Sequence, residues 1–144
     1  MRYKEIAATE DQSVFLLLFE KDERTMESLL EFVREKKITV ASFVGLGAFS
    51  EATLAFYDRE SRTYAPIPVT EQVELLNITG NVALYEGEPR LHAHATLSRP
   101  DGTTIGGHLM EGIVWPTLEI TLSSFRSQVE RKLDEETGLP LLDL

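Results

Sequence analysis

The stretch LHAHATLSRPDGTTIGGHLMEG, residues Leu91–Gly112, contains all three histidines of the chain and a turn motif between them. His92 and His94 are two residues apart, so in a β-strand their side chains point to the same face, about 7 Å apart along it. The tetrapeptide RPDG at residues 99–102 favours a type I turn followed by a glycine in the left-handed region, which makes a three-residue loop with a bulge. The stretch therefore predicts a β-hairpin that carries histidines on both strands.

The loop length decides whether the histidines meet. If Arg99 pairs with Thr103, His94 lies directly opposite His108, with Cβ atoms about 4.5–5.5 Å apart, and His92 lies diagonally within reach. A two-residue loop would turn His108 to the other face of the sheet. A further bulge at the two glycines that precede His108 would have the same effect. The predicted loop thus places three imidazoles on one face, provided that this register forms.

Such a face has the donors of a metal site. Zinc accepts neutral imidazole nitrogens, and three histidines leave a fourth tetrahedral position open. Glu111 and Glu119 are candidates, from their proximity in sequence, for a further ligand or a base near the metal. Gly106 and Gly107 allow close backbone approach by a neighbouring strand or a ligand. The alternative is that the histidines form hydrogen bonds on a half-buried face and that the glycines fit a tight strand contact.

Length and composition predict one domain spanning residues 1–144. The chain is 42% hydrophobic and 26% charged, which is ordinary for a globular protein. It has no cysteine, so disulfides and thiolate metal sites are excluded. No apolar run approaches the roughly 20 residues that span a bilayer, and the N-terminal sequence lacks the apolar core of a signal peptide. We therefore expect a cytoplasmic protein that does not interact with membranes.

The acidic charge balance disfavours nucleic-acid binding by the isolated chain. Twenty-four acidic residues and 14 lysines and arginines give a net charge of −10. Proteins that grip nucleic acid usually present a basic face to the phosphates. No basic run in the chain is longer than two residues, as at Lys36-Lys37.

The hydrophobic pattern predicts an α+β fold with one main helix on a mostly antiparallel sheet. Thr25 is the expected N-cap of a helix, and Met26, Leu29, Leu30 and Val33 form its apolar stripe. Gly80 and Asn81 are expected to mark a bulge, and Trp115-Pro116 a turn. The expected strands are Val14–Glu20, Ile38–Phe49, Ala52–Tyr57, Val73–Tyr85, Leu91–Ser98, Thr103–Met110 and Thr117–Ser124.

Other motif families fit poorly. Cupins also place an H-x-H on a strand, but they need a glutamate a few residues downstream, and residues 95–99 read ATLSR. Gly45-Leu46-Gly47 lacks the third glycine of a dinucleotide-binding loop. The chain has neither a cysteine nucleophile nor a Gly-x-Ser-x-Gly elbow.

The order of segments resembles the PPC (plants and prokaryotes conserved) family over nearly the whole chain, and the H-x-H, Asp-Gly turn and Gly-Gly-His-Leu block is its most specific part. The resemblance implies an α+β fold that assembles as a homotrimer. It also implies a metal, zinc or another divalent transition metal, held by residues matching His92, His94 and His108. The other quoted segments are VGLGAFSEATLAFYD, VELLNITGNVAL, TLEITL and ETGLPLLDL.

Three functional hypotheses follow. The favoured one is a trimeric metal-binding module with a regulatory or small-ligand role rather than an enzyme. The second is a DNA-associated regulator, because plant members join this domain to an AT-hook, although this chain has no Arg-Gly-Arg-Pro hook. The third is a metal-dependent hydrolase or lyase in which Glu111 or Glu119 acts as general base.

Overall fold

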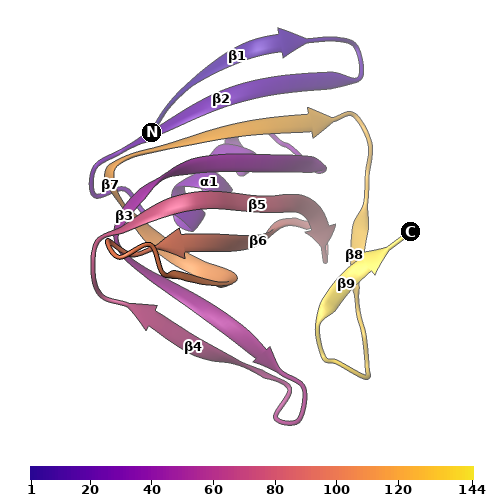
Figure 1. The fold of residues 1–144 in the computed structure, drawn as a ribbon. Coiled ribbons are helices and arrows are strands. Elements are labelled where there is room, and N and C mark those ends of the chain that lie inside the picture. The colour runs from indigo at the N-terminus through magenta and orange to yellow at the C-terminus, as the bar shows by residue number, and fades with distance from the viewer.

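Alternation of buried and exposed side chains along most of the chain produces nine strands and one helix (Figure 1). The computed structural model describes all of residues 1–144. The elements, in chain order, are β1 (Arg2–Ala8), β2 (Gln12–Glu20), α1 (Thr25–Glu35), β3 (Ala41–Asp58), β4 (Thr63–Val69), β5 (Val73–Tyr85), β6 (Glu88–Ser98), β7 (Thr104–Phe125), β8 (Glu130–Leu133) and β9 (Pro140–Asp143).

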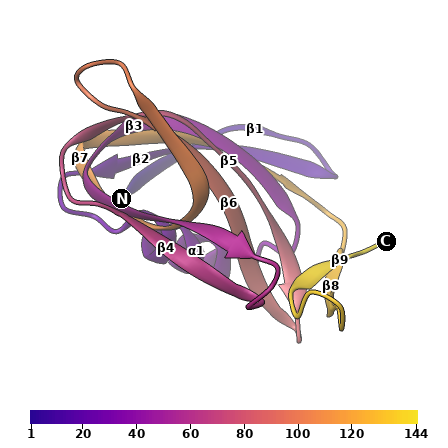
Figure 2. The same cartoon turned by 60° about the horizontal axis from the view of Figure 1, so that its bottom comes forward.

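The strands form one curved, mostly antiparallel sheet, as the α+β prediction requires. Its main path runs β1-β2-β7-β3-β5-β8-β9, with β4 paired to β3 and β6 paired to both β5 and β7. Strands β3, β5, β6 and β7 therefore close on one another. The contact between β5 and β8 is parallel and involves one residue pair, Leu84 with Glu130. The two longest strands, β3 and β7, are strongly curved (Figure 2).

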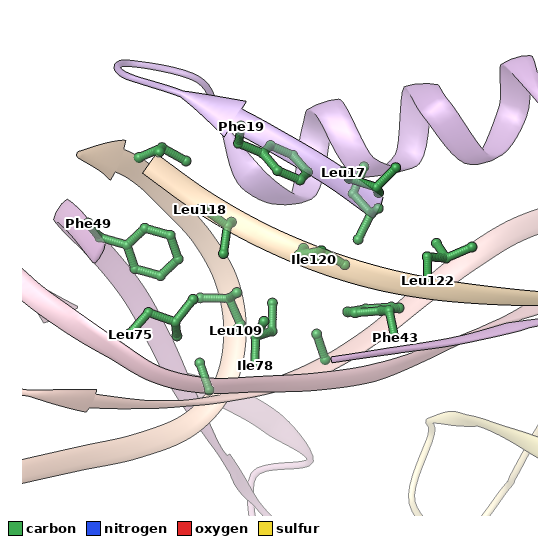
Figure 3. Packing of buried hydrophobic residues seen from close by; sticks show 14 of the residues in the cluster. Leu17, Phe19, Phe43, Phe49, Leu75, Ile78, Leu109, Leu118, Ile120 and Leu122 are labelled. Carbon is green, nitrogen blue, oxygen red and sulfur yellow. The ribbon is translucent and has the colours of Figure 1, made fainter. Parts of the chain in front are cut away.

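The core lies on the concave side of this sheet, together with α1. Leu29, Phe32 and Val33 of the helix are buried, with at most 2% of their surface exposed. They belong to one cluster with buried side chains of the long strands, part of which Figure 3 shows from close by. The helix contacts β6 and β7, the two strands of the histidine hairpin. No helix of the chain is both long and apolar enough to span a membrane.

Two expected strand breaks are absent. The segments on either side of Phe49 form one strand, β3. Its pairing with β5 and with β7 shifts register at bulges. Trp115-Pro116 is a cis peptide within continuous β7 rather than a turn between two strands. The bulge expected at Gly80 and Asn81 is also wrong, because the register of β5 with β6 shifts between Leu75 and Asn77.

Strands β1 and β4 were not expected from the sequence. All seven residues of β1 are exposed, so the strand has no buried face that would mark it in the sequence pattern. Strand β4 contains Pro66 and Pro68, and prolines argue against a central strand. It pairs only with β3, on an edge where prolines are tolerated. The C-terminal segment forms the hairpin β8–β9.

The helix N-terminus is capped from a distance. Arg24, not Thr25, is the N-cap residue, and its side chain makes no capping hydrogen bond. The carboxylate of Glu111 on β7 accepts hydrogen bonds from the backbone N–H groups of Met26 (2.8 Å) and Glu27 (3.4 Å). A negative charge at this end of a helix is favourable because it satisfies free N–H donors and complements the helix dipole. Glu111 therefore ties α1 to β7.

We predict that Glu111→Ala lowers the free energy of unfolding by about 1–2 kcal/mol, the usual cost of losing a helix cap. Urea unfolding followed by circular dichroism measures this change. Glu119→Ala is the matched control, because Glu119 is exposed on the same strand and its side chain makes no hydrogen bond or salt bridge. Its effect should stay within about 0.5 kcal/mol. Equal losses in the two variants would contradict a capping role for Glu111.

Candidate metal centre

The turn between β6 and β7 has the predicted geometry. The N–H of Gly102 donates to the carbonyl of Arg99 at 2.9 Å, and Gly102 has a φ of +80°. The N–H of Arg99 donates to the carbonyl of Thr103, also at 2.9 Å. The Asp101 carboxylate accepts hydrogen bonds from the Thr103 N–H (2.9 Å) and hydroxyl (2.7 Å). Arg99 therefore faces Thr103, as the loop prediction required.

This register brings the three histidines together. His94 lies directly opposite His108, and the pairing stays regular from Ser98–Thr104 to that point. The ring centroids are 5.1 Å apart for His92 and His94, 5.3 Å for His92 and His108, and 5.5 Å for His94 and His108. One ring nitrogen from each histidine can be chosen so that all three lie within 4.8 Å of one another. The predicted three-histidine face is thus present.

The histidines lie on the face of the sheet that points away from the core. Their neighbours on β6, Ala93 and Ala95, are 1% and 4% exposed and belong to the core cluster. Because side chains alternate along a strand, His92 and His94 point to the opposite side. Tyr64 of β4 covers His108, with ring centroids 4.6 Å apart.

The site favours neutral imidazoles. Burial lowers the pKa of His108 to about 4, and the nearby His92 and His94 add to the shift. Burial also lowers the pKa of His92, with smaller contributions from His94 and Arg131. A neutral imidazole offers a free lone pair, which a metal ligand must have. These side chains therefore present metal-binding nitrogens without first having to lose protons at neutral pH.

The donor set fits a zinc-like ion. Nδ1 of His108 is buried and has no hydrogen-bond partner, which is unusual for a buried polar atom. A nitrogen that binds a metal needs no hydrogen-bond partner, so this atom fits the role of a ligand. Tetrahedral bonds of about 2.0–2.1 Å separate ligand nitrogens by about 3.3 Å, so modest side-chain rotations would close the set around an ion. Three imidazoles without a thiolate suit zinc and related transition metals.

The two candidate glutamates do not join the histidines. The Glu111 carboxylate accepts hydrogen bonds from the N-terminus of α1 and from the N–H of its own neighbour, Gly112, at 2.9 Å. Glu119 is exposed and pairs with Leu18 and Leu46, far along β7 from His108. The cluster that could hold a metal contains histidines only. The expectation of a nearby carboxylate on β7 is therefore not met in this structure.

Gly106 and Gly107 lie against neighbouring strands. A Cβ on Gly107 would come within 2.8 Å of the carbonyl oxygen of Ala55 in β3. At Gly106 the nearest atom, the carbonyl oxygen of Ala95, would be 3.2 Å away. The close approach at Gly107 lets β7 pack on β3 while His108 keeps its place beside Tyr64.

A small pocket of about 180 Å³ adjoins the cluster. His92 and His108 form one wall, and Arg131, Pro140 and Leu141 of the hairpin β8–β9 form another. Sequence reasoning missed Tyr64 and Arg131. Both lie on elements outside the histidine hairpin, and neither belongs to a local motif that marks it as a site residue.

Most of the chain matches a known protein family. A model of the Plants and Prokaryotes Conserved domain, abbreviated PCC or PPC, matches residues 6–126. The chain belongs to this family. The match contains the whole histidine hairpin and ends before the hairpin β8–β9 begins.

Solved structures with the same fold include a PPC protein from Pyrococcus horikoshii, 30% identical, with a TM-score of 0.86 over 96% of this chain and 98% of that one. A "metal-containing protein" from Archaeoglobus fulgidus is 28% identical, with a TM-score of 0.86 over 100% and 99% of the two chains. A "putative DNA-binding protein" from Ralstonia eutropha JMP134 is 34% identical, with a TM-score of 0.85 over 90% of each chain.

A curated relative is much longer than this chain. The bifunctional protein GlmU of a Synechococcus strain is 30% identical over 116 residues, which is 78% of this chain. The chain spans 17% of that protein's length. The likeness therefore concerns one segment of that protein.

We predict that the metal-free protein loses stability as the pH falls from about 6.5 towards about 4. In this range the unfolded chain protonates His108, whose ordinary pKa is 6.5, whereas the folded chain does not until about pH 4. The unfolded state then binds more protons, so acid favours it, and the effect is absent above pH 6.5. One such proton changes stability by at most about 1.4 kcal/mol per pH unit, and by less at a partly solvated site.

Urea unfolding at pH 7.0, 6.0 and 5.0 measures this slope. His108→Gln should reduce it, because glutamine does not titrate. The same slope in both proteins would show that the imidazole of His108 is not held neutral by the fold.

Proposed function

We propose that this chain is a zinc-binding module in which His92, His94 and His108 ligate the metal, with a regulatory or small-ligand role. The observation that carries the proposal is the convergence of three imidazoles on one face, where Nδ1 of His108 is buried without a partner. The metal-containing relative from Archaeoglobus fulgidus, which has the same fold along its whole length, supports it. Bound zinc would supply a Lewis acid with one open position.

The chain's own residues would prepare this centre. The turn at Pro100–Gly102 holds His94 against His108, and Tyr64 packs on the His108 ring. Both contacts limit side-chain freedom before the metal arrives. Because burial lowers the pKa of His92 and of His108, binding at neutral pH would not have to displace protons from these two imidazoles.

We further propose that residues 1–144 act as one domain that assembles as a homotrimer. The outer face of the sheet carries exposed apolar side chains on adjoining strands. Leu16 of β2 and Val44 of β3 are 42% and 54% exposed and flank Thr121 of β7. Leu46 follows on β3 and is 59% exposed. Contiguous exposed apolar residues are typical of interfaces, and self-association would cover them.

DNA binding is the second candidate, favoured by the name of the Ralstonia eutropha protein. The net charge of −10 opposes it, because the chain would have to neutralise phosphates through a local basic surface. A gel shift at low salt followed by a salt titration separates the candidates, since phosphate-driven affinity falls steeply with salt. A hydrolase or lyase is less well supported, because Glu111, one proposed base, is bound to α1 and Glu119, the other, lies away from the histidines.

Elemental analysis of the untagged protein tests the metal proposal. We expect about one zinc or similar ion per chain in the wild type and its loss in His92→Ala/His108→Ala, because one histidine alone binds such an ion weakly. Glu119→Ala, outside the cluster, should keep the wild-type metal content. Circular dichroism confirms that each variant is folded. Equal metal content in the double variant and the wild type would rule out these histidines as the ligands.

A further inference from the structure

The hairpin β8–β9 places an arginine beside the histidine cluster. Figures 1 and 2 both show this hairpin at the end of β5, next to β6. One guanidinium N–H of Arg131 donates to the side-chain oxygen of Asn81 at 2.6 Å, and another donates to the carbonyl of Pro140 at 3.0 Å. Asn81 pairs with His92 across β5 and β6. Arg131 is thereby fixed next to His92.

The hairpin itself is held in place. The Leu84 N–H donates to the carbonyl of Val129 at 2.9 Å, where the chain enters β8. The Tyr57 hydroxyl of β3 donates to the carbonyl of Thr137 in the β8–β9 loop. Arg131 therefore projects from an anchored element and not from a free tail.

The Arg131 side chain keeps unused hydrogen-bonding capacity. A guanidinium has five N–H donors, and two of them have the partners described above. The Nε atom is buried and has no partner. The remaining N–H groups, on the two terminal nitrogens, are the ones available to an acceptor in the pocket.

The pocket is a basic site in an acidic protein. Its lining contains Arg90, Arg131 and two histidines, and it contains no aspartate or glutamate. Neither arginine makes a salt bridge, although the chain has ten more acidic residues than lysines and arginines together. Arg90 lies over the Tyr85 ring, 5.4 Å from its centroid, and Arg131 faces the cavity without a protein counter-ion. This unpaired cation indicates an anionic ligand.

Size and apolar lining narrow the class of anion. The volume of about 180 Å³ is close to the roughly 150 Å³ of a protein cavity that holds benzene, which suits a ligand of about six non-hydrogen atoms. Leu91, Leu139, Pro140 and Leu141 supply an apolar part of the wall. An organic anion with a short carbon chain matches this lining better than a fully polar ion does.

We propose that this pocket binds a small organic carboxylate, whose oxygens accept hydrogen bonds from Arg131 and whose carbon chain lies against the leucines. Arginine suits this role because its planar fork matches a carboxylate. The proposal deepens the proposed function, since His92 and His108 belong to both the metal set and the pocket. Arg131 lies beyond residues 6–126, the range that the family model matches.

NMR chemical-shift titration of zinc-loaded protein with butyrate tests this proposal. Butyramide, equal in size but uncharged, and inorganic phosphate serve as comparison ligands at constant ionic strength. We expect butyrate to bind at least tenfold more tightly than either. Arg131→Gln should weaken butyrate at least tenfold with the zinc content unchanged, because the charge-assisted hydrogen bonds are lost. Arg126→Gln, a matched loss of charge outside the pocket, should leave binding as it is.

Because Arg131 also helps to hold the hairpin, Leu141→Trp provides a second variant that keeps the arginine. The larger ring should fill the pocket and weaken butyrate by a similar factor. Binding of butyrate no tighter than butyramide, tighter binding of phosphate, or unchanged affinity in both variants would overturn the proposal.

The zinc content of the wild type, together with the same titration on metal-free protein, separates failure of the carboxylate proposal from failure of the metal proposal. A wild type that holds zinc but binds no butyrate would contradict only the carboxylate site. A wild type that retains no zinc and binds butyrate through Arg131 would contradict only the metal proposal.

Discussion

The backbone hydrogen bond from the Arg99 N–H to the Thr103 carbonyl closes the turn between β6 and β7, and it sets the register of both strands. A shift of one residue would turn the side chains of one strand to the opposite face, and would separate His108 from the other two histidines. It would also turn Leu109 out of the core. The same pairing thus serves burial on one face of the sheet and the histidine cluster on the other.

The closure of β3, β5, β6 and β7 on one another extends this constraint to the surroundings of the cluster. Because Ala55 of β3 pairs with both His108 and Pro66, strand β4 lies close enough for Tyr64 to cover the His108 ring. At the other end, β5 carries Asn81, which receives Arg131 from the C-terminal hairpin. A site on the outer face is in this way walled by two peripheral elements, while the helix and the core lie on the inner face.

Local sequence was sufficient for some features and not for others. The Pro-Asp-Gly turn and the spacing of the histidines predicted the cluster, since both depend on neighbouring residues and on the alternation of side chains in a strand. The role of Glu111 depends on where α1 lies relative to β7, and nothing near Thr25 signals it. Strand β4 was missed because Pro66 and Pro68 disfavour most strands, and Arg131 because its significance arises only when the hairpin meets Asn81.

X-ray absorption at the zinc edge of the zinc-loaded protein tests the central claim most directly, because it reports the atoms bound to the metal. Three imidazoles brought together by the β6–β7 register predict three nitrogen neighbours at about 2.0–2.1 Å, the outer-shell scattering of imidazole rings, and one further light ligand. A first shell made of oxygen alone, or containing a single imidazole, would contradict the account.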